Sequence, residues 1–161
     1  MNAPDRTHDW TEANQRLLVA EFGRLKRLLR GEDAGDTASL RDAMPAPAAI
    51  DRLAERFGLS SFERDLLLLV AGVEMDAELA HLCAGAAAGS RRPHASFGLA
   101  LAVLPDPHWS ALTPVRPLRR WRLIDAADDG ALVAARLRID ERVLHYLLME
   151  IGVCKDTPDV D

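Results

Sequence analysis

The sequence predicts a mainly α-helical domain with one small β-hairpin. A leucine-rich run at residues 66–70 follows a helix-start signal, and several other segments repeat apolar residues every three or four positions. Nearer the C-terminus, apolar and charged residues alternate on both sides of an Asp-Gly pair, a pattern typical of a hairpin. With 161 residues, of which 48% are apolar, the chain can bury one self-sufficient core.

An amphipathic helix is predicted to begin at Trp10 and end at Arg30. Leu18, Phe22 and Leu25 form its apolar stripe, and basic residues in the later turns suit the helix dipole. We expect the helix to pack on the body of the protein, with self-association through this stripe as the alternative. Residues 31–46 are rich in Gly, Asp, Ala and Pro, which predicts a linker. Residues 1–46 are therefore assigned to an N-terminal helix and linker.

The centre of the core is predicted in the helix that follows Ser60. Ser60 and Glu63 have capping-box spacing, and Gly58 can end the preceding short helix in a left-handed conformation. Apolar residues fill one face of the new helix, and Leu67 and Leu68 extend the apolar surface to its other side. This distribution indicates a helix that is packed on several sides.

Two more short helices follow this central helix. Asp76 is predicted to cap a helix carrying Leu79 and Cys83, and Ser96 to cap a helix that begins at Phe97. Trp109 comes directly after a proline-bounded loop. We interpret its side chain as a packed apolar anchor, and we interpret those of Trp10 and Trp121 in the same way.

The period changes from helical to alternating at Arg119. One strand is predicted over 119–124 and a second over 133–138, joined by a turn at 128–130. Asp140 then caps a final helix that ends at Gly152, and the polar residues 153–161 are expected to be a disordered tail. Short helices followed by a two-stranded wing are the element order of winged-helix domains. Residues 47–152 are therefore predicted to be a winged-helix-like domain, preceded by the N-terminal helix.

Composition excludes several classes of protein. No run of 18 uncharged apolar residues is present, and the first nine residues lack the parts of a signal peptide, so we expect a cytoplasmic protein with no membrane partner. Cys83 and Cys154 fall in different predicted elements and do not suggest a disulfide framework. His81 and Cys83 are the only close Cys/His pair, so a metal site is not expected either.

Motifs that carry catalysis are missing from the sequence. It contains no Gly-x4-Gly-Lys-Ser/Thr phosphate loop, no Gly-x-Ser-x-Gly elbow and no His-Glu-x-x-His pair. Capping and turn formation already explain the paired acidic residues at 74–76 and 128–129. We therefore predict no catalytic, cofactor-binding or metal-binding residues, and expect the chain alone not to be an enzyme.

An arginine group on and before the hairpin is the candidate interaction surface, and Arg120, Arg122, Arg136 and Arg138 are predicted to lie on one alternating face of the hairpin. Residues 91–124 hold six arginines and one aspartate, although the net charge of the whole chain is −5. Such side chains can pair with nearby acids, dock an acidic protein face or contact phosphates. The acidic net charge and the apolar character of residues 97–104 argue against nucleic acid. The candidate residues are Arg116, Arg119, Arg120, Arg122, Arg136 and Arg138.

Four blocks of sequence carry a resemblance to a known family. They read LSSFERDLLLL (59–69), SFGLALA (96–102), LPDPHWSALTP with PLRRWRL (104–114 and 117–123) and LRIDERVLHYL (137–147). In this order they resemble the N-terminal winged-helix-like domain of bacterial AAA+ ATPases encoded with phage-tail-like contractile injection systems. The matching blocks cover roughly residues 47–148.

The resemblance implies a non-catalytic adaptor domain with a protein partner, such as a component of an injection particle. In that family an ATPase module follows the last helix, so ATP and Mg²⁺ would bind in a module that this chain lacks. We expect the chain to be an N-terminal region separated from its motor or a stand-alone relative. The alternatives are a winged-helix nucleic-acid binder, for which the hairpin arginines are the reason, and an oligomerisation module that helps to build the ATPase ring.

Overall fold

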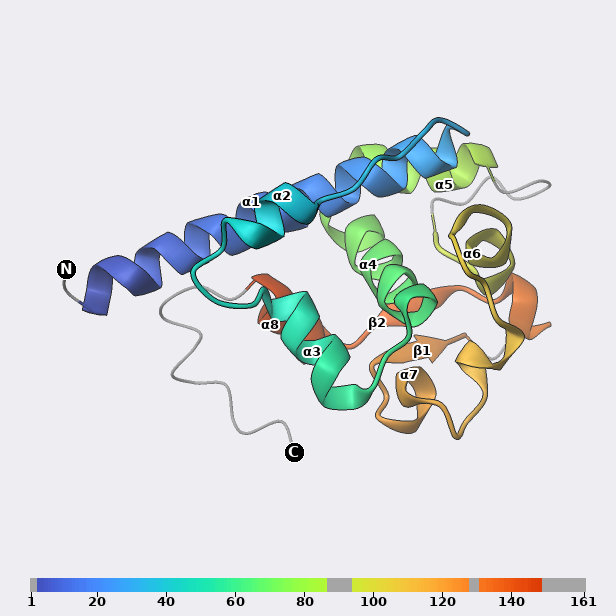
Figure 1. Cartoon of the computed structure of the whole chain (residues 1–161). Helices are drawn as coiled ribbons and strands as arrows, with labels where there is room; N and C mark the ends of the chain where they lie inside the picture. The colour runs from blue at the N-terminus through green and yellow to red at the C-terminus, as the bar shows by residue number, and fades with distance from the viewer. Residues whose placement is uncertain (1–2, 87–93, 128–130, 149–161) are drawn as a thin grey trace.

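The computed structural model describes residues 3–86, 94–127 and 131–148, and it is mainly helical with one two-stranded antiparallel sheet. Figure 1 shows the long helix α1 along one side of the molecule, with α4 in the middle and the sheet beyond α4. The elements are α1 (Ala3–Leu29), α2 (Ala38–Asp42), α3 (Ala49–Phe57), α4 (Ser61–Met75), α5 (Ala77–Ala86), α6 (Phe97–Val103), the 3-10 helix η1 (Trp109–Leu112), α7 (Pro117–Arg120), β1 (Ile124–Ala126), the 3-10 helix η2 (Leu132–Ala134), β2 (Leu137–Ile139) and α8 (Glu141–Leu148).

The central helix α4 begins and is buried as its sequence predicts. Ser60 Oγ accepts a hydrogen bond from the Glu63 amide, and the Glu63 carboxylate accepts one from the Ser60 amide, so the capping box is complete. Gly58 ends α3 with a φ of 68°. All four leucines at 66–69 are 0% exposed, because α1, α3, α5, α6 and β2 surround this helix. The prediction of a helix packed on several sides is confirmed.

Helix α1 is longer than predicted, since it begins at Ala3 rather than at Trp10. Its buried residues Leu17, Leu18, Phe22 and Leu25 belong to the same core cluster as α4. Asn14 also connects α1 to α3 and α8 by hydrogen bonds. Its side-chain amide donates one to the Leu147 carbonyl of α8 and accepts one from the Ala49 amide at the start of α3. The apolar stripe proposed for self-association is therefore occupied within the chain.

Helices α1 and α5 can pack closely against α4 because residue 72 of α4 is a glycine. A Cβ added there would lie 2.1 Å from Leu79 Cδ2 and 3.1 Å from Phe22 Cδ1. We expect Gly72→Ala to lower the free energy of unfolding by about 1 to 3 kcal/mol, because both neighbours must shift. Urea denaturation will measure the change. Gly23→Ala is the matched control, since nothing lies within 4 Å of an added Cβ and the better helix propensity should raise stability by about 0.5 to 1 kcal/mol.

A buried polar cluster joins α1, α2, α3 and α4. Glu21 is 0% exposed and receives hydrogen bonds from Arg24 Nε at 2.7 Å and from Arg41 Nη2 at 2.7 Å. Arg24 also donates to the buried Asp65, and Arg41 reaches Asp51 of α3 at 2.8 Å. The stretch 31–46, predicted as a linker, thus contains the short helix α2, which is held to the body by Arg41. The division of the chain at residue 46 stays a prediction.

The pKa values of the carboxyl groups in and near this cluster shift in opposite directions. Burial alone would raise the pKa of Glu21, but the hydrogen bonds and charges of Arg24 and Arg41 outweigh burial and lower it. Burial raises the pKa of Asp65, and Arg24 compensates only in part. Two residues after Arg24 in α1, Lys26 donates a hydrogen bond to Asp76 and lowers the pKa of that carboxyl group.

We expect the free energy of unfolding to fall in acid. Carboxyl groups with lowered pKa values stabilise the fold while they are ionised, and this stabilisation is lost when they are protonated. A carboxyl group whose folded pKa is depressed stabilises the fold above its unfolded pKa, and this contribution is lost as the pH falls through the folded pKa. For Glu21 and Asp76 that window lies below about pH 4. Asp65 has the opposite effect on stability. Because its folded pKa is raised, the ionised carboxylate destabilises the fold, and protonation as the pH falls removes that destabilisation.

Denaturant unfolding between pH 7 and pH 3 will measure this dependence. Lys26→Met should make the dependence shallower, because it removes the group that lowers the pKa of Asp76. A free energy of unfolding that stays constant down to pH 3 would show that these ion pairs contribute nothing.

The hairpin exists, but its strands lie nearer the C-terminus than predicted. β1 pairs with β2 so that Ile124 faces Ile139 and Ala126 faces Leu137. Residues 119 and 120, the start of the predicted first strand, belong to α7 instead, because Pro117 is suited to open a helical turn. Arg122 then adopts a φ of 55° and turns the chain into β1. The first two residues of the predicted second strand, 133 and 134, lie in the 3-10 helix η2, and β2 begins only at Leu137.

Several other expectations concern single side chains. Asp76, Ser96 and Asp140 accept hydrogen bonds from backbone amides in the first turns of α5, α6 and α8, as predicted. Cys83 is fully buried, and burial raises the pKa of its thiol to about 12. The predicted turn at 128–130, Gly152, Cys154 and the tail 153–161 lie outside the described residues.

Candidate functional site

The segment between α6 and β1 is fastened to the start of α4. Arg116 holds the fully buried Glu63 with two hydrogen bonds, of which the one from Nε measures 3.0 Å. His108 Nε2 lies 2.7 Å from Ser60 Oγ, and His108 Nδ1 lies 2.9 Å from Ser110 Oγ. The residues that cap α4 thus also position the segment 108–116.

Electrostatics favour this attachment at neutral pH. Burial alone would raise the pKa of Glu63, but Arg116 and the Ser60 amide outweigh it and lower the pKa. Glu63 is therefore a charged partner for Arg116 under ordinary conditions. Arg116, one of the six candidate arginines, serves to hold the segment in place.

The other five candidate arginines have different surroundings. Arg119 Nη1 donates to the Leu112 carbonyl at 3.3 Å, and the Arg120 guanidinium lies over the Trp121 ring, 5.2 Å from its centroid. Arg122, Arg136 and Arg138 are exposed and make no side-chain ion pair or hydrogen bond within residues 3–86, 94–127 and 131–148.

The structure does not bring these arginines onto one face of a hairpin. Arg120 ends α7 and Arg122 follows it, whereas Arg138 lies on β2 opposite Asp125 of β1. Arg136 comes before β2 and forms an isolated bridge with Ser96. The prediction of one alternating face is wrong, because the helical turn that begins at Pro117 and the turn at Arg122 remove residues 119–122 from the predicted first strand.

The three tryptophans also differ from one another. Trp10 is buried, as predicted, and its indole donates to the Pro47 carbonyl at 3.0 Å. Trp109 is 68% exposed and Trp121 is 49% exposed, so neither is the packed anchor that the sequence suggested. Each rests on an inner aromatic ring, Phe97 for Trp109 and Phe57 for Trp121.

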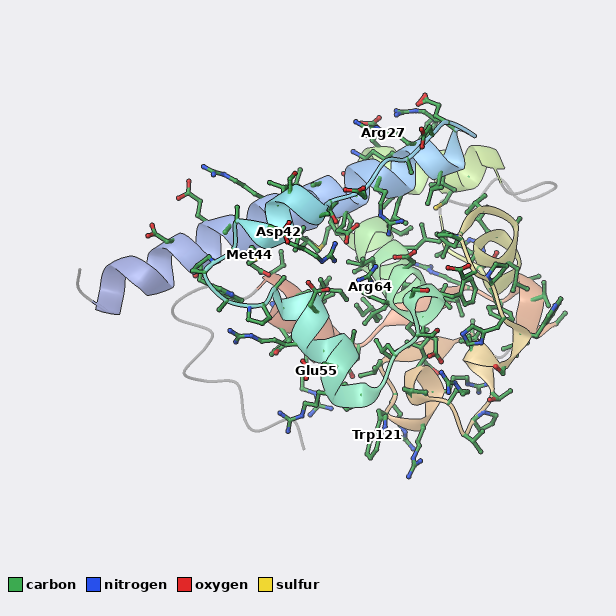
Figure 2. All side chains as sticks on the ribbon, in the orientation of Figure 1. Arg27, Asp42, Met44, Glu55, Arg64 and Trp121 are labelled. Atoms are coloured by element: carbon green, nitrogen blue, oxygen red, sulfur yellow. The ribbon has the colours of Figure 1, made fainter. Side chains whose placement is uncertain are left out.

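The side chains around Trp121 form the candidate site. We define the Trp121 surface as Phe57, Arg120, Trp121 and Arg122, which come from the end of α3 and from the junction between α7 and β1. Figure 2 shows Trp121 at the edge of the molecule near the end of α3, pointing away from the body. The sequence signal for this site is a tryptophan flanked by three arginines within five residues after Pro117.

Comparison with family models supplies the classification that the fold alone leaves open. The model described as "Winged helix domain, variant" matches residues 2–151. The chain belongs to this winged helix family. No curated protein and no solved structure matches it.

Membership of the winged helix family agrees with the predicted fold class. In this winged helix domain the β1–β2 hairpin is the wing, and α8 follows it. The family match includes α1, so the N-terminal helix lies within the matched range.

Two features are missing from the part of the winged helix domain that the structure describes. In that part of the chain no three His, Cys, Asp or Glu side chains gather where they could hold a metal ion. Within the same residues, no helix combines the length and apolar character that crossing a membrane requires.

Proposed function

We propose that this winged helix domain is a protein-interaction module of an AAA+ ATPase that serves a contractile injection system. ATP binding and hydrolysis would reside in a separate module, and the domain would recognise a component of the particle. The resemblance of four sequence blocks to the N-terminal domains of such ATPases supports the assignment to this system.

The observation that carries the interaction role is the exposure of large apolar side chains in one segment. Trp109, Val115 and Trp121 are 68%, 76% and 49% exposed, although the segment is held firmly by Glu63 and His108. Exposed aromatic residues on a rigid support are common at protein interfaces. The segment therefore has the composition and the rigidity of a docking site.

A pull-down from cells that carry the particle genes tests this function. The tagged chain should enrich particle proteins, and a variant with Trp109→Ser and Trp121→Ser should enrich fewer of them. Val19→Ser is the matched control, because Val19 is also exposed, at 69%, but lies on α1. Equal recovery of particle proteins by the wild type and by an unrelated tagged protein would refute the proposal.

Nucleic-acid binding is the second candidate function. Arg122, Arg136 and Arg138 have no acidic partner among the described residues, so their guanidinium groups are available for phosphates. A winged helix domain that binds duplex DNA should show affinity that falls steeply with salt and is lost in Arg136→Glu/Arg138→Glu. Absence of binding at low salt would exclude this candidate.

A further inference from the structure

We infer that the Trp121 surface binds an acidic peptide segment that carries an apolar side chain. The inference rests on the proposed interaction function and specifies the chemistry of its partner. It depends on three features of this surface: how Trp121 is held, which charges flank it in the sequence and what covers its ring.

Trp121 is held in place although half of it faces solvent. Its ring centroid lies 5.9 Å from that of Phe57, with the two planes tilted by 48°. The Arg120 guanidinium covers the ring at 5.2 Å from the centroid. Contacts from α3 and from α7 thus fix the indole before any partner arrives, which lowers the entropic cost of binding.

The charged residues that flank Trp121 in the sequence are all arginines. Residues 107–124 contain four arginines and no acidic residue, and only Arg116 of the four pairs with a carboxylate among the described residues. Arg120 and Arg122 flank Trp121 directly and are exposed. Carboxylates of a partner would meet two guanidinium groups there, which favours acidic segments and disfavours basic ones.

The geometry of the ring favours a peptide over a nucleic acid. Single-stranded nucleic acids bind aromatic residues by stacking bases on an open ring face. On Trp121 the guanidinium of Arg120 covers one ring face and the Phe57 ring lies beside the indole at a tilt of 48°, so less of the ring is free for a base to stack on. That N–H makes no hydrogen bond within residues 3–86, 94–127 and 131–148. A half-exposed indole whose N–H can donate, next to two exposed guanidinium groups, suits an apolar side chain beside a carboxylate.

Fluorescence anisotropy with labelled synthetic peptides tests the inference on the full chain. Four probes of equal length are compared: an acidic peptide with leucine and phenylalanine, an acidic peptide with serine in their place, a basic peptide with the same apolar residues, and oligothymidylate. Only the first should bind well, and raising the salt concentration should weaken its binding.

Two variants locate the binding. Trp121→Ala and Arg122→Glu should each raise the dissociation constant at least tenfold. Arg16→Glu should leave the dissociation constant within twofold, because Arg16 is an exposed arginine of α1. Arg122→Glu changes only an exposed side chain, so it remains informative if Trp121→Ala lowers the melting temperature.

The outcomes separate the inference from the proposed function. Equal binding of the acidic and basic peptides, preferential binding of oligothymidylate, or unchanged affinity in both variants would overturn the inference. The pull-down then decides the proposed function independently: particle proteins retained by Trp121→Ala would support an interaction role on another surface. If the acidic peptide binds but no particle proteins are enriched, the role in the injection system is refuted. The assignment of the Trp121 surface as a peptide-binding site would then still hold.

Discussion

Leu67→Ala should lower the free energy of unfolding by about 2 to 5 kcal/mol, because it opens a cavity on the side of α4 that an amphipathic surface helix would leave in solvent. Leu67 is 0% exposed, as are its neighbours Leu66 and Leu68. A domain of ordinary stability has about 5 to 15 kcal/mol in total, so the loss is a large fraction of it. The melting temperature should fall by on the order of 10 °C.

Calorimetry of the wild type and of two variants will check this expectation. Val19→Ala removes apolar atoms from an exposed position of α1 and should change stability by less than about 0.5 kcal/mol. Equal effects of Leu67→Ala and Val19→Ala would mean that α4 is not enclosed by its neighbours, and the described packing would then be wrong.

Arg24→Met should cost about 3 kcal/mol of stability, because it leaves two buried carboxylates without their shared partner. Breaking a buried ion pair by removing one member typically costs 3 to 5 kcal/mol. The lower figure applies here, because Glu21 keeps Arg41 at 2.7 Å and Asp65 keeps Arg64 at 3.8 Å. Urea denaturation at pH 7 will measure the cost.

The pH dependence of this variant gives a second readout. Protonation of Asp65 removes the unpaired charge, so the deficit of Arg24→Met should shrink as the pH falls through the raised pKa of Asp65. Arg16→Met is the control, since its pair with Glu12 is exposed and worth well under about 1 kcal/mol. A deficit independent of pH would show that lost packing, rather than charge, is the cause.

Local signals made most helices predictable. The capping box of Ser60 and Glu63, the left-handed Gly58 and the caps Asp76, Ser96 and Asp140 act within a few residues, so the chain itself specifies them. Helix α2 was missed because tertiary contacts stabilise it: Arg41 is held by Glu21 and Asp51, which are 20 and 10 residues away.

The hairpin and the candidate site were harder to predict for the same reason. Alternation at 119–124 is real in the sequence, but a helical turn after Pro117 and the left-handed Arg122 move the strand to Ile124. Arg116 could not be distinguished from the other arginines, since its partner Glu63 lies 53 residues earlier. The exposure of Trp121 depends on which residues of other elements cover its ring. The spacing of apolar residues along the sequence does not predict those contacts.

Site-specific photo-crosslinking at position 121 tests the central claim, that the domain holds a protein through the Trp121 surface, most directly. A photoreactive phenylalanine replaces Trp121 in the full chain, and a second chain carries it at the exposed Val19 of α1. The predicted result is a protein adduct specific to position 121, with the crosslink in an acidic segment and reduced by Arg122→Glu. Adducts to nucleic acid at position 121, or the same adducts from both positions, would contradict the claim.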